Sequence, residues 1–435
     1  MPAINAPPPG RIERAAGHLL VAALFTVSFS TWLTNFFALL CLALFGAWCL
    51  LRRPRLPKAA VAPGWLALLL LAALVVGASC SIAPPADVGQ ALKKYAKLLM
   101  LPAAIVLSLR DPGLSWRALT SYACGSALLA LSCYLVWLGA MPASPLGWWR
   151  IGDAGDAFAF KNHITIGILL GFSAAASLLL ASHSASIRAR IAWTFACVFL
   201  AIPVLFLNQG RTGYVAVLVA LVALFVLRVR VTPLRAVAAM CAIAFMFAGL
   251  YATSTNFRSR TTDLVTEVRT GQTTSPNGMR VSFLRTGLQA VAKHPWTGNG
   301  TGAFAEIHAP VARTIWGAGT PMGEARNQPH SEFLLIAVQL GLPGLALYVA
   351  MLASFLRPAF RVRSRERDML LLLWSVYTVC SVFNSLLWDP TEASWFLMLA
   401  GCLYAALWRQ AEENSLRATL NSEMGSPDKL HRLLV

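Results

Sequence analysis

Apolar runs close to the roughly twenty residues that a membrane-spanning helix needs constrain this chain more than any other feature of its sequence. Residues 65–76 and 215–227 are examples, and their apolar side chains do not alternate with polar ones. Only 12% of the 435 residues are charged, whereas a soluble domain has about 25%. A membrane β-barrel would need alternating strands of about ten residues. The sequence therefore predicts an all-α, polytopic integral membrane protein.

Short basic clusters between the apolar runs predict the topology. The clusters are residues 52–58, 110–117, 188–190, 228–235 and 357–367. All of them fall on one face of the predicted bundle, and the positive-inside rule assigns such loops to the cytoplasm. About twelve spans with both termini inside follow from this rule. The same loops account for the net charge of +18, so no nucleic-acid partner is expected.

One polar stretch is much longer than the other loops and is predicted on the opposite, periplasmic face, before the tenth span. The predicted organisation is nine transmembrane helices in residues 1–252, the periplasmic loop in 253–329, helices ten to twelve in 330–410, and a cytoplasmic tail in 411–435. Within the loop, apolar side chains recur on one helical face of residues 280–293. The loop is therefore predicted to contain an amphipathic helix.

Several cations break the one-sided pattern because they lie at the outer rim of the predicted bundle. They are Lys93 and Lys97 at the mouth of the fourth span, Arg150, Arg211 in a turn between two spans, and Arg280 and Arg285 on the amphipathic helix. The arginine fork and the lysine point charge both suit phosphate oxygens. Snorkelling of a long side chain to the membrane surface is the alternative for each residue. Together these cations predict an anionic headgroup as the ligand.

Four histidines lie on the predicted outer side. His330 stands where the long loop enters the tenth span, and His163 stands at the mouth of the sixth. An imidazole can accept a proton from a sugar hydroxyl near neutral pH, which makes His330 the candidate base. A packed or helix-capping histidine is the alternative. His294, His308 and the carboxylate Glu332 are rival bases.

Acidic residues are scarce on the predicted outer side. The outer loops contain no Asp-x-Asp and no carboxylate cluster, so neither a metal site nor another cofactor is predicted. The nine cysteines include no Cys-x-x-Cys pair. No acidic residue lies in the middle of a span, which argues against an ion-coupled transporter. A non-catalytic lipid or glycan transporter stays open as an alternative.

Three short motifs resemble the O-antigen ligase family. His330 and Ser331, separated by nine residues from the Gly-Leu-Pro-Gly segment at 341–344, match its His-[Asn/Ser/Gln], nine residues, Gly-x-x-[Gly/Thr/Tyr] pattern. Residues 294–304 resemble its His-Pro-x-x-Gly-x-Gly-x-Gly-x-Phe segment, and residues 209–213 resemble its arginine-bearing turn. The wider group includes O-antigen polymerases and protein O-oligosaccharyltransferases. Its topology agrees with the prediction over nearly the whole chain.

The resemblance implies a lipid-linked glycan transferase of the bacterial inner membrane with a periplasmic active site. The donor would be O-antigen on undecaprenyl pyrophosphate, and the acceptor would be a sugar hydroxyl of the lipid A core. Membrane lipids are the other partners expected. His330 would be the base and Arg211 a pyrophosphate contact, in a metal-independent, inverting transfer. An O-antigen polymerase or a protein O-oligosaccharyltransferase is the alternative within the group.

Overall fold

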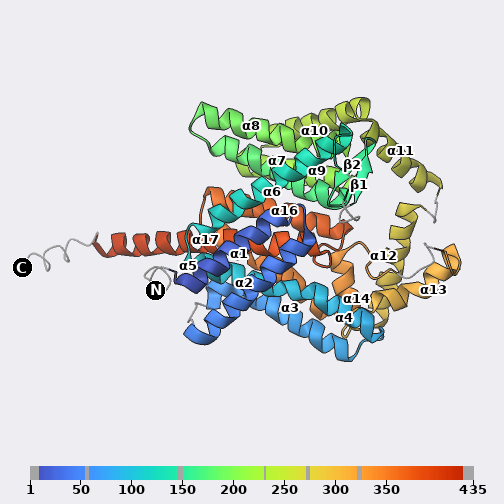
Figure 1. The fold of residues 1–435 in the computed structure, drawn as a ribbon, viewed down its shortest axis with the longest axis horizontal. Coiled ribbons are helices and arrows are strands. Elements are labelled where there is room, and N and C mark those ends of the chain that lie inside the picture. Colours follow the sequence, from blue (N-terminus) through green and yellow to red (C-terminus); the bar gives the residue numbers. More distant parts are fainter. Residues whose placement is uncertain are drawn as a thin grey trace, which may run out of the picture.

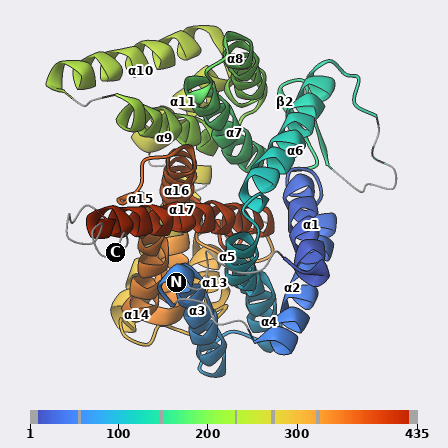
Figure 2. The same cartoon turned by 90° about the vertical axis from the view of Figure 1, so that its left-hand side faces the viewer.

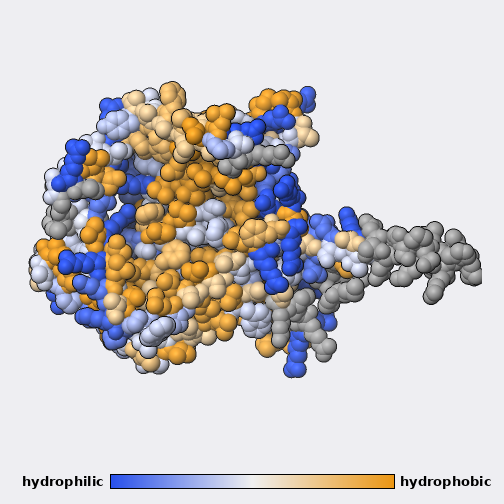
Figure 3. Space-filling view, turned by 180° about the vertical axis from the view of Figure 1, so that it is seen from behind, coloured by the Kyte–Doolittle hydropathy of each residue, from blue (hydrophilic) through white to orange (hydrophobic). Residues whose placement is uncertain are grey.

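The computed structural model of the chain describes residues 9–53, 58–142, 144, 150–229, 232–270, 275–320 and 326–424. Helices dominate these residues, which confirms an all-α membrane protein. Figure 3 shows a broad hydrophobic band across the molecule with hydrophilic residues towards both ends, as expected of a bundle that lies in a bilayer. Parts of the predicted basic clusters (54–57 and 230–231), of the long loop (271–274 and 321–325) and of the tail (425–435) lie outside the described residues.

The helices follow the predicted apolar runs closely. In the first part of the chain they are α1 (Arg11–Thr26), α2 (Thr31–Arg52), α3 (Ala62–Ser79), α4 (Pro85–Tyr95), α5 (Met100–Arg110), α6 (Leu114–Trp137), α7 (His163–His183), α8 (Ile187–Ile202), α9 (Arg211–Arg228) and α10 (Pro233–Thr253). After these come α11 (Thr255–Thr270), α12 (Pro276–Lys293), α13 (Phe304–Trp316), α14 (Glu332–Ser354), α15 (Leu356–Ala359), α16 (Arg365–Phe383) and α17 (Pro390–Met424).

Two short 3-10 helices, one short π-helix and one small β-hairpin are the other described elements. The short helices are η1 (Lys58–Val61), η2 (Ala96–Leu99) and the π-helical η4 (Pro203–Leu207). The strands β1 (Ile151–Asp153) and β2 (Asp156–Ala159) pair antiparallel, with Asp153 opposite Asp156. The all-α prediction did not include this hairpin, which lies directly before α7.

Eight of the described helices are long and apolar enough to cross a membrane. They are α2, α3 with the preceding η1, α6, α7, α8 with η4, α9, α10 and α14. The other four predicted spans fall on α1, on α4 with α5, on α16 and on α17. Among these, α1 has only 16 residues and α16 begins with Glu366 and Asp368 in its first turn. The count of twelve therefore stays a prediction.

The predicted fourth span is not one continuous helix. Pro102 has no N–H to donate to the carbonyl four residues before it, which removes one bond of an α-helical ladder. The chain tightens here into η2, where the N–H of Met100 reaches the carbonyl of Lys97. This break separates α4 from α5, whose residues are mostly buried.

The core of the bundle forms around α17, whose residues 395–408 are almost wholly buried. It packs against α5 and α16, and α16 packs on α7 and α9. Figure 2 shows α7 to α11 together at one side and α1 to α5 with α14 at the other. In Figure 1 the helices of the long loop, α11 to α13, lie at the end of the molecule opposite both termini. Since α17 continues to Met424, the predicted tail begins within a helix.

Candidate functional site

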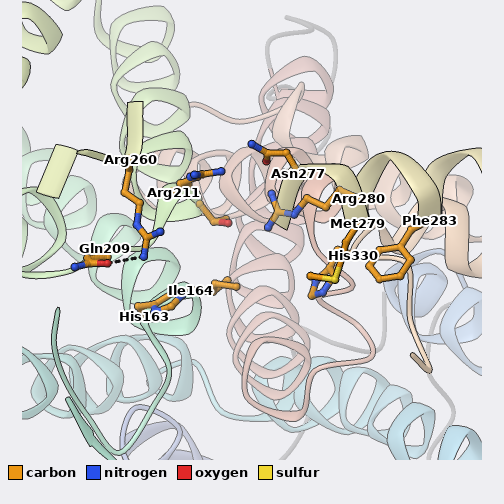
Figure 4. Close-up of a pocket in the computed structure, with 11 residues that line it drawn as sticks. His163, Ile164, Gln209, Arg211, Arg260, Asn277, Met279, Arg280, Phe283 and His330 are labelled. Carbon is orange, nitrogen blue, oxygen red and sulfur yellow. Dashed lines mark hydrogen bonds between the residues drawn. The ribbon is translucent and has the colours of Figure 1, made fainter. Parts of the chain in front are cut away.

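One cavity of about 280 Å³ gathers four of the residues singled out in the sequence: His163, Arg211, Arg280 and His330. It lies at the end of the bundle that carries α11 and α12, which we call the outer end. The remaining lining residues are Ile164, Gln209, Thr212, Arg260, Asn277, Met279 and Phe283. Figure 4 shows these side chains converging from α7, α9, α11, α12 and the segment before α14. Residues far apart in the sequence thus form one site.

The position of Arg211 depends on a close approach of two helices. Arg211 is the first residue of α9, and the preceding Gly210 lies against the start of α7. A Cβ atom on Gly210 would lie 2.5 Å from the carbonyl oxygen of His163, and one on Gly213 would lie 2.9 Å from the Cα of Gly167. Larger residues would push the helices apart. The two glycines of this motif therefore bring Arg211 beside His163.

His163 is held by the hairpin that precedes α7. Its Nδ1 lies 3.2 Å from Oδ2 of Asp156, and Oδ1 of the same carboxylate accepts from the backbone N–H of Gln209 at 2.9 Å. Burial alone would raise the pKa of Asp156, but the bonds from His163 and Gln209 outweigh it and lower the pKa. Asp156 therefore stays ionised and fixes His163 relative to the turn before α9.

The helices of the long loop supply the other two arginines. Arg260 of α11 donates to the side-chain oxygen of Gln209, and Arg280 projects from the first turns of α12 (Figure 4). Glu267 links the two helices because its carboxylate accepts from Arg211 at 3.4 Å and from Asn277. Three arginines thus face a cavity that no carboxylate lines among the residues that the structure describes. The site is cationic.

His330 lies just before α14 in a conformation that is uncommon for a residue with a side chain. Its φ is +54°, in the left-handed region. Ser331 then caps α14 by accepting from the N–H of Leu334, and the imidazole packs against Phe283, with ring centroids 5.9 Å apart. Strained backbone of this kind is concentrated at functional sites. The turn directs His330 into the cavity rather than along the helix.

The glycine-rich segment at 294–304 does not line this cavity but holds α14 in place. Gly341 has a φ of +68° and breaks α14, which frees backbone carbonyls on its outer half. The N–H of Asn299 donates to Val338 at 2.9 Å, and the N–H of Gly300 donates to Gln339 at 3.0 Å. The spacing of the His330 motif therefore has a physical reason, because the kink and the segment bound to it fix the outer half-helix that His330 precedes.

Burial and neighbouring cations keep the imidazole of His330 neutral. Burial is the larger cause, and with the charges of Arg280 and Arg326 it lowers the pKa of His330 to about 4. Arg280 is itself half-buried, and burial lowers the pKa of its guanidinium, as does the neighbouring Arg211. At neutral pH the cavity therefore holds arginine cations beside an imidazole that can accept a proton.

The rival bases lie elsewhere. Glu332 is fully buried and its carboxylate accepts from the Tyr95 hydroxyl and from the N–H groups of Leu387 and Trp388, at 2.9 to 3.1 Å. This carboxylate ties three segments together and does not line the cavity. His308 is buried, with its ring stacked on Phe304. His294 is the exposed residue that follows α12.

Four predicted substrate contacts lie outside this cavity. Lys93 is exposed on α4, Lys97 is half-buried in η2, and Arg150 is exposed just before β1. Arg285 is exposed on α12, five residues from Arg280 and therefore on a different face. Arg285 does not line this cavity, and its predicted role as a substrate contact stays a prediction.

The amphipathic helix itself is present as α12, but it begins at Pro276 rather than at Arg280. Its apolar face is largely exposed: Val281, Leu284 and Leu288 are 65%, 50% and 55% exposed. The helix packs on α14 through a different face, where a Cβ atom on Gly287 would lie 2.7 Å from Leu334. The interior of the molecule therefore does not use the apolar stripe seen in the sequence.

Several residues in the cavity or beside it were missed from the sequence. Arg260 was one of eight basic residues in the long loop, and nothing in its neighbourhood distinguished it. Asp156 joins His163 to Gln209, which lies 53 residues further along the chain, and Asn277 binds Glu267 of the neighbouring helix, so no short motif reveals either residue. Among the described residues, no group of three or more histidine, cysteine or acidic side chains could hold a metal ion.

Residues 195–349 match the model of a protein family described as O-antigen ligase. The resemblance to that family is confirmed. The match runs from α8 into α14, so it includes the three arginines of the cavity and His330, whereas Asp156 and His163 precede it. No curated protein matches the chain. The match indicates a glycosyltransferase-like membrane enzyme of the O-antigen ligase/polymerase superfamily.

Proposed function

We propose that the protein is an O-antigen ligase, which transfers polysaccharide from undecaprenyl pyrophosphate to a sugar hydroxyl of the lipid A core. One observation carries the proposal. A neutral imidazole, His330, shares a cavity with three arginines, and the family match spans all four residues. The cations suit the diphosphate of a lipid-linked donor, and the imidazole suits the proton of an acceptor hydroxyl.

The chemistry follows from this separation of roles. His330 takes the proton from the acceptor hydroxyl, the hydroxyl oxygen attacks the anomeric carbon, and the bond to the pyrophosphate oxygen breaks with inversion. Arg211, Arg260 and Arg280 stabilise the charge that develops on the departing diphosphate, as preorganised cations do. Positioned charges thereby take the place of a divalent cation. A well-placed base contributes about 10²- to 10⁴-fold to the rate.

His163 has a supporting role in this mechanism. Its Nδ1 is engaged by Asp156, which fixes the ring and leaves Nε2 for a ligand in the cavity. Because the Nδ1 proton is directed to Asp156, the neutral ring presents Nε2 as an acceptor, which suits a hydroxyl of the donor sugar on the α7 side, while Arg280 binds the diphosphate from the α12 side. The donor headgroup is thus held between the two walls of the cavity.

The proposed topology places this cavity on the periplasmic side of a bacterial inner membrane. Twelve spans, with the four less apolar segments crossing alongside the eight apolar helices, put both termini in the cytoplasm. The separation of α11 to α13 from the termini in Figure 1 supports this arrangement. The donor and the acceptor lipids would then both approach from the outer leaflet.

Deletion of the protein in its host, followed by analysis of lipopolysaccharide, tests the proposal. Loss of all O-antigen on the lipid A core, with full-length lipid-linked polymer accumulating, is expected of a ligase. Lipopolysaccharide capped with single repeats would instead indicate a polymerase. Unchanged lipopolysaccharide with loss of glycan on a protein would indicate a protein O-oligosaccharyltransferase.

A point substitution tests the site directly. His330→Ala should abolish transfer while the protein still inserts and still binds the lipid-linked donor. His294→Ala, which changes an exposed histidine outside the cavity, is the matched control and should transfer normally. Loss of donor binding in His330→Ala would make the imidazole a phosphate contact, and near-normal transfer would remove it from the mechanism.

A further inference from the structure

A second cavity, of about 400 Å³, lies at the other end of the same helices. Its floor is the last part of α7, with Leu178 and Ala181, and its walls are the start of α8 and the end of α9. Because α8 and α9 each pack on α7, they leave a groove between them. The three helices lie together in Figure 2, at one side of the molecule. This groove is distinct from the outer cavity, since α7 carries His163 at its opposite end.

The lining of the groove is that of a lipid site, with apolar length and a cationic head. Leu224 and Phe225 of α9 add to the apolar floor, while Arg190 of α8 and Arg228 of α9 line the same groove. Side chains next to these on the helix surfaces are apolar and exposed: Ile191 by 63%, Phe195 by 73% and Val226 by 57%. In a membrane protein such a surface faces acyl chains. The groove therefore opens towards lipid.

The charges at this corner do not balance. Arg228 donates to Oδ2 of Asp368 at 3.4 Å and lies 3.1 Å from Nε2 of His183, while Arg367 occupies the other oxygen of Asp368 at 3.1 Å. Arg190 bonds to the backbone carbonyl of Ser184 at 3.3 Å. A guanidinium has five N–H donors. Arg228 and Arg367 thus share one carboxylate while Arg190 meets a carbonyl, and the two arginines that line the groove keep donors for an anion.

We infer that this groove binds one anionic phospholipid from the leaflet opposite the outer cavity. Its phosphate accepts from Arg190 and Arg228, and one acyl chain lies over Leu178, Ala181 and Phe225. Basic pockets between transmembrane helices recognise phospholipid headgroups in this way. The inference does not depend on the proposed transfer reaction. Since α7 and α9 also carry residues of the outer cavity, the bound lipid would hold together two helices on which that cavity depends.

The test measures lipid retention by purified protein in nanodiscs of phosphatidylcholine that contain increasing phosphatidylglycerol. Mass spectrometry of the protein after release should show one phosphatidylglycerol bound in preference to phosphatidylcholine. The double variant Arg190→Gln/Arg228→Gln should bind it roughly tenfold to thirtyfold more weakly. The double variant Arg14→Gln/Arg188→Gln removes the same charge from exposed positions that do not line the groove, and it should retain binding.

A variant without charge change guards against misfolding caused by the loss of the Asp368 contact. Ser182→Trp places a large side chain in the groove and should block the acyl chain while leaving both arginines in place. Equal retention by all variants would overturn the inference, because the lipid would then belong to the general lipid belt. Competition by inorganic phosphate as effective as that by phosphatidylglycerol would also overturn it, since the groove would then bind a free anion.

Discussion

The low pKa of His330 makes a prediction about pH that separates this site from an ordinary histidine site. A base works only when it is unprotonated. Because burial and two arginines lower the pKa of His330 to about 4, the imidazole should be neutral throughout the range from pH 5 upwards. The acid limb of kcat/KM, which reports the free enzyme, should therefore lie near pH 4 rather than near the ordinary value of 6.5.

The size of the effect follows from the same values. One pKa unit corresponds to about 1.4 kcal/mol, so the difference between 6.5 and about 4 disfavours the protonated form of His330 by about 3 kcal/mol. In the unfolded chain this histidine binds a proton near pH 6.5. Above that pH His330 is neutral in both states, so the folded state does not lose any of its free energy of unfolding to protonation of this group. Up to about 3 kcal/mol of the free energy of unfolding is lost as the pH falls from 6.5 towards 4, because the unfolded chain takes up the proton first.

The perturbation that tests the cause is Arg280→Gln. This change removes a cation that lowers the pKa of His330, so the acid limb of kcat/KM should move upwards towards 6.5. The assay follows transfer by purified protein from extracted lipid-linked donor to lipid A core over a range of pH. Because Arg280 is also a proposed diphosphate contact, the height of the profile should fall, and only the position of the limb tests the electrostatic argument.

A matched control lies on the same helix. Arg285→Gln removes the same charge from an exposed position outside the cavity and should leave the limb where it is in the unaltered protein. A wild-type limb near pH 6.5 that Arg280→Gln does not move would refute the reasoning. A limb that moves equally in both variants would instead point to a general effect of net charge.

Four further predictions follow from the geometry. Arg211→Ala should cripple transfer and Arg211→Lys should restore it only in part, because lysine cannot make a bidentate phosphate contact; full turnover in Arg211→Ala would count against the site. Transfer by purified protein should continue in excess chelator, and rescue by magnesium after loss would contradict this. Gly210→Ala should reduce transfer and should lower the free energy of unfolding by about 1–3 kcal/mol in a thermal unfolding assay. Gly249→Ala, whose added Cβ atom would have no neighbour within 4 Å, should change neither transfer nor stability. In a background without exposed cysteines, Ala318→Cys and Ala185→Cys should label from opposite sides of the membrane, and labelling of both from one side would end the proposed topology.

Much of the fold could be predicted from the sequence because a bilayer leaves few options. Long apolar runs must be helical there, and most of the described helices in these runs follow the predicted ones to within a few residues. The exception is α17, which continues past residue 410 to Met424. The break between α4 and α5 was not foreseen, although Pro102 was its visible signal. The exposed apolar stripe of α12 shows the converse problem. Periodicity identifies a helix with an apolar face, but it does not say whether that face meets protein or lipid.

The site could be predicted only where a residue stood in a motif or against the topology. His330 and Arg211 were found in this way, and both line the cavity. Arg260 was not found because its role depends on how α11 folds back over the start of α9. The outer lysines of α4 and η2 were chosen only because they lie at the outer rim of the predicted bundle. This position along the membrane normal does not determine towards which neighbouring helix a side chain points. Placement along the membrane normal was thus predictable, while placement around it required the tertiary structure.

The cationic lining of the cavity links the binding of an anion to the chemistry of His330. The charges of Arg280 and Arg326 lower the pKa of His330, and those charges would be offset by the diphosphate of a donor. Filling the site therefore removes one cause of the low pKa and makes the imidazole a stronger base. Without a donor, His330 is neutral but a weak acceptor of protons. On this argument the proposed donor contributes to activating the base that its own transfer requires, and the arginines act both as phosphate contacts and as the coupling between the two steps.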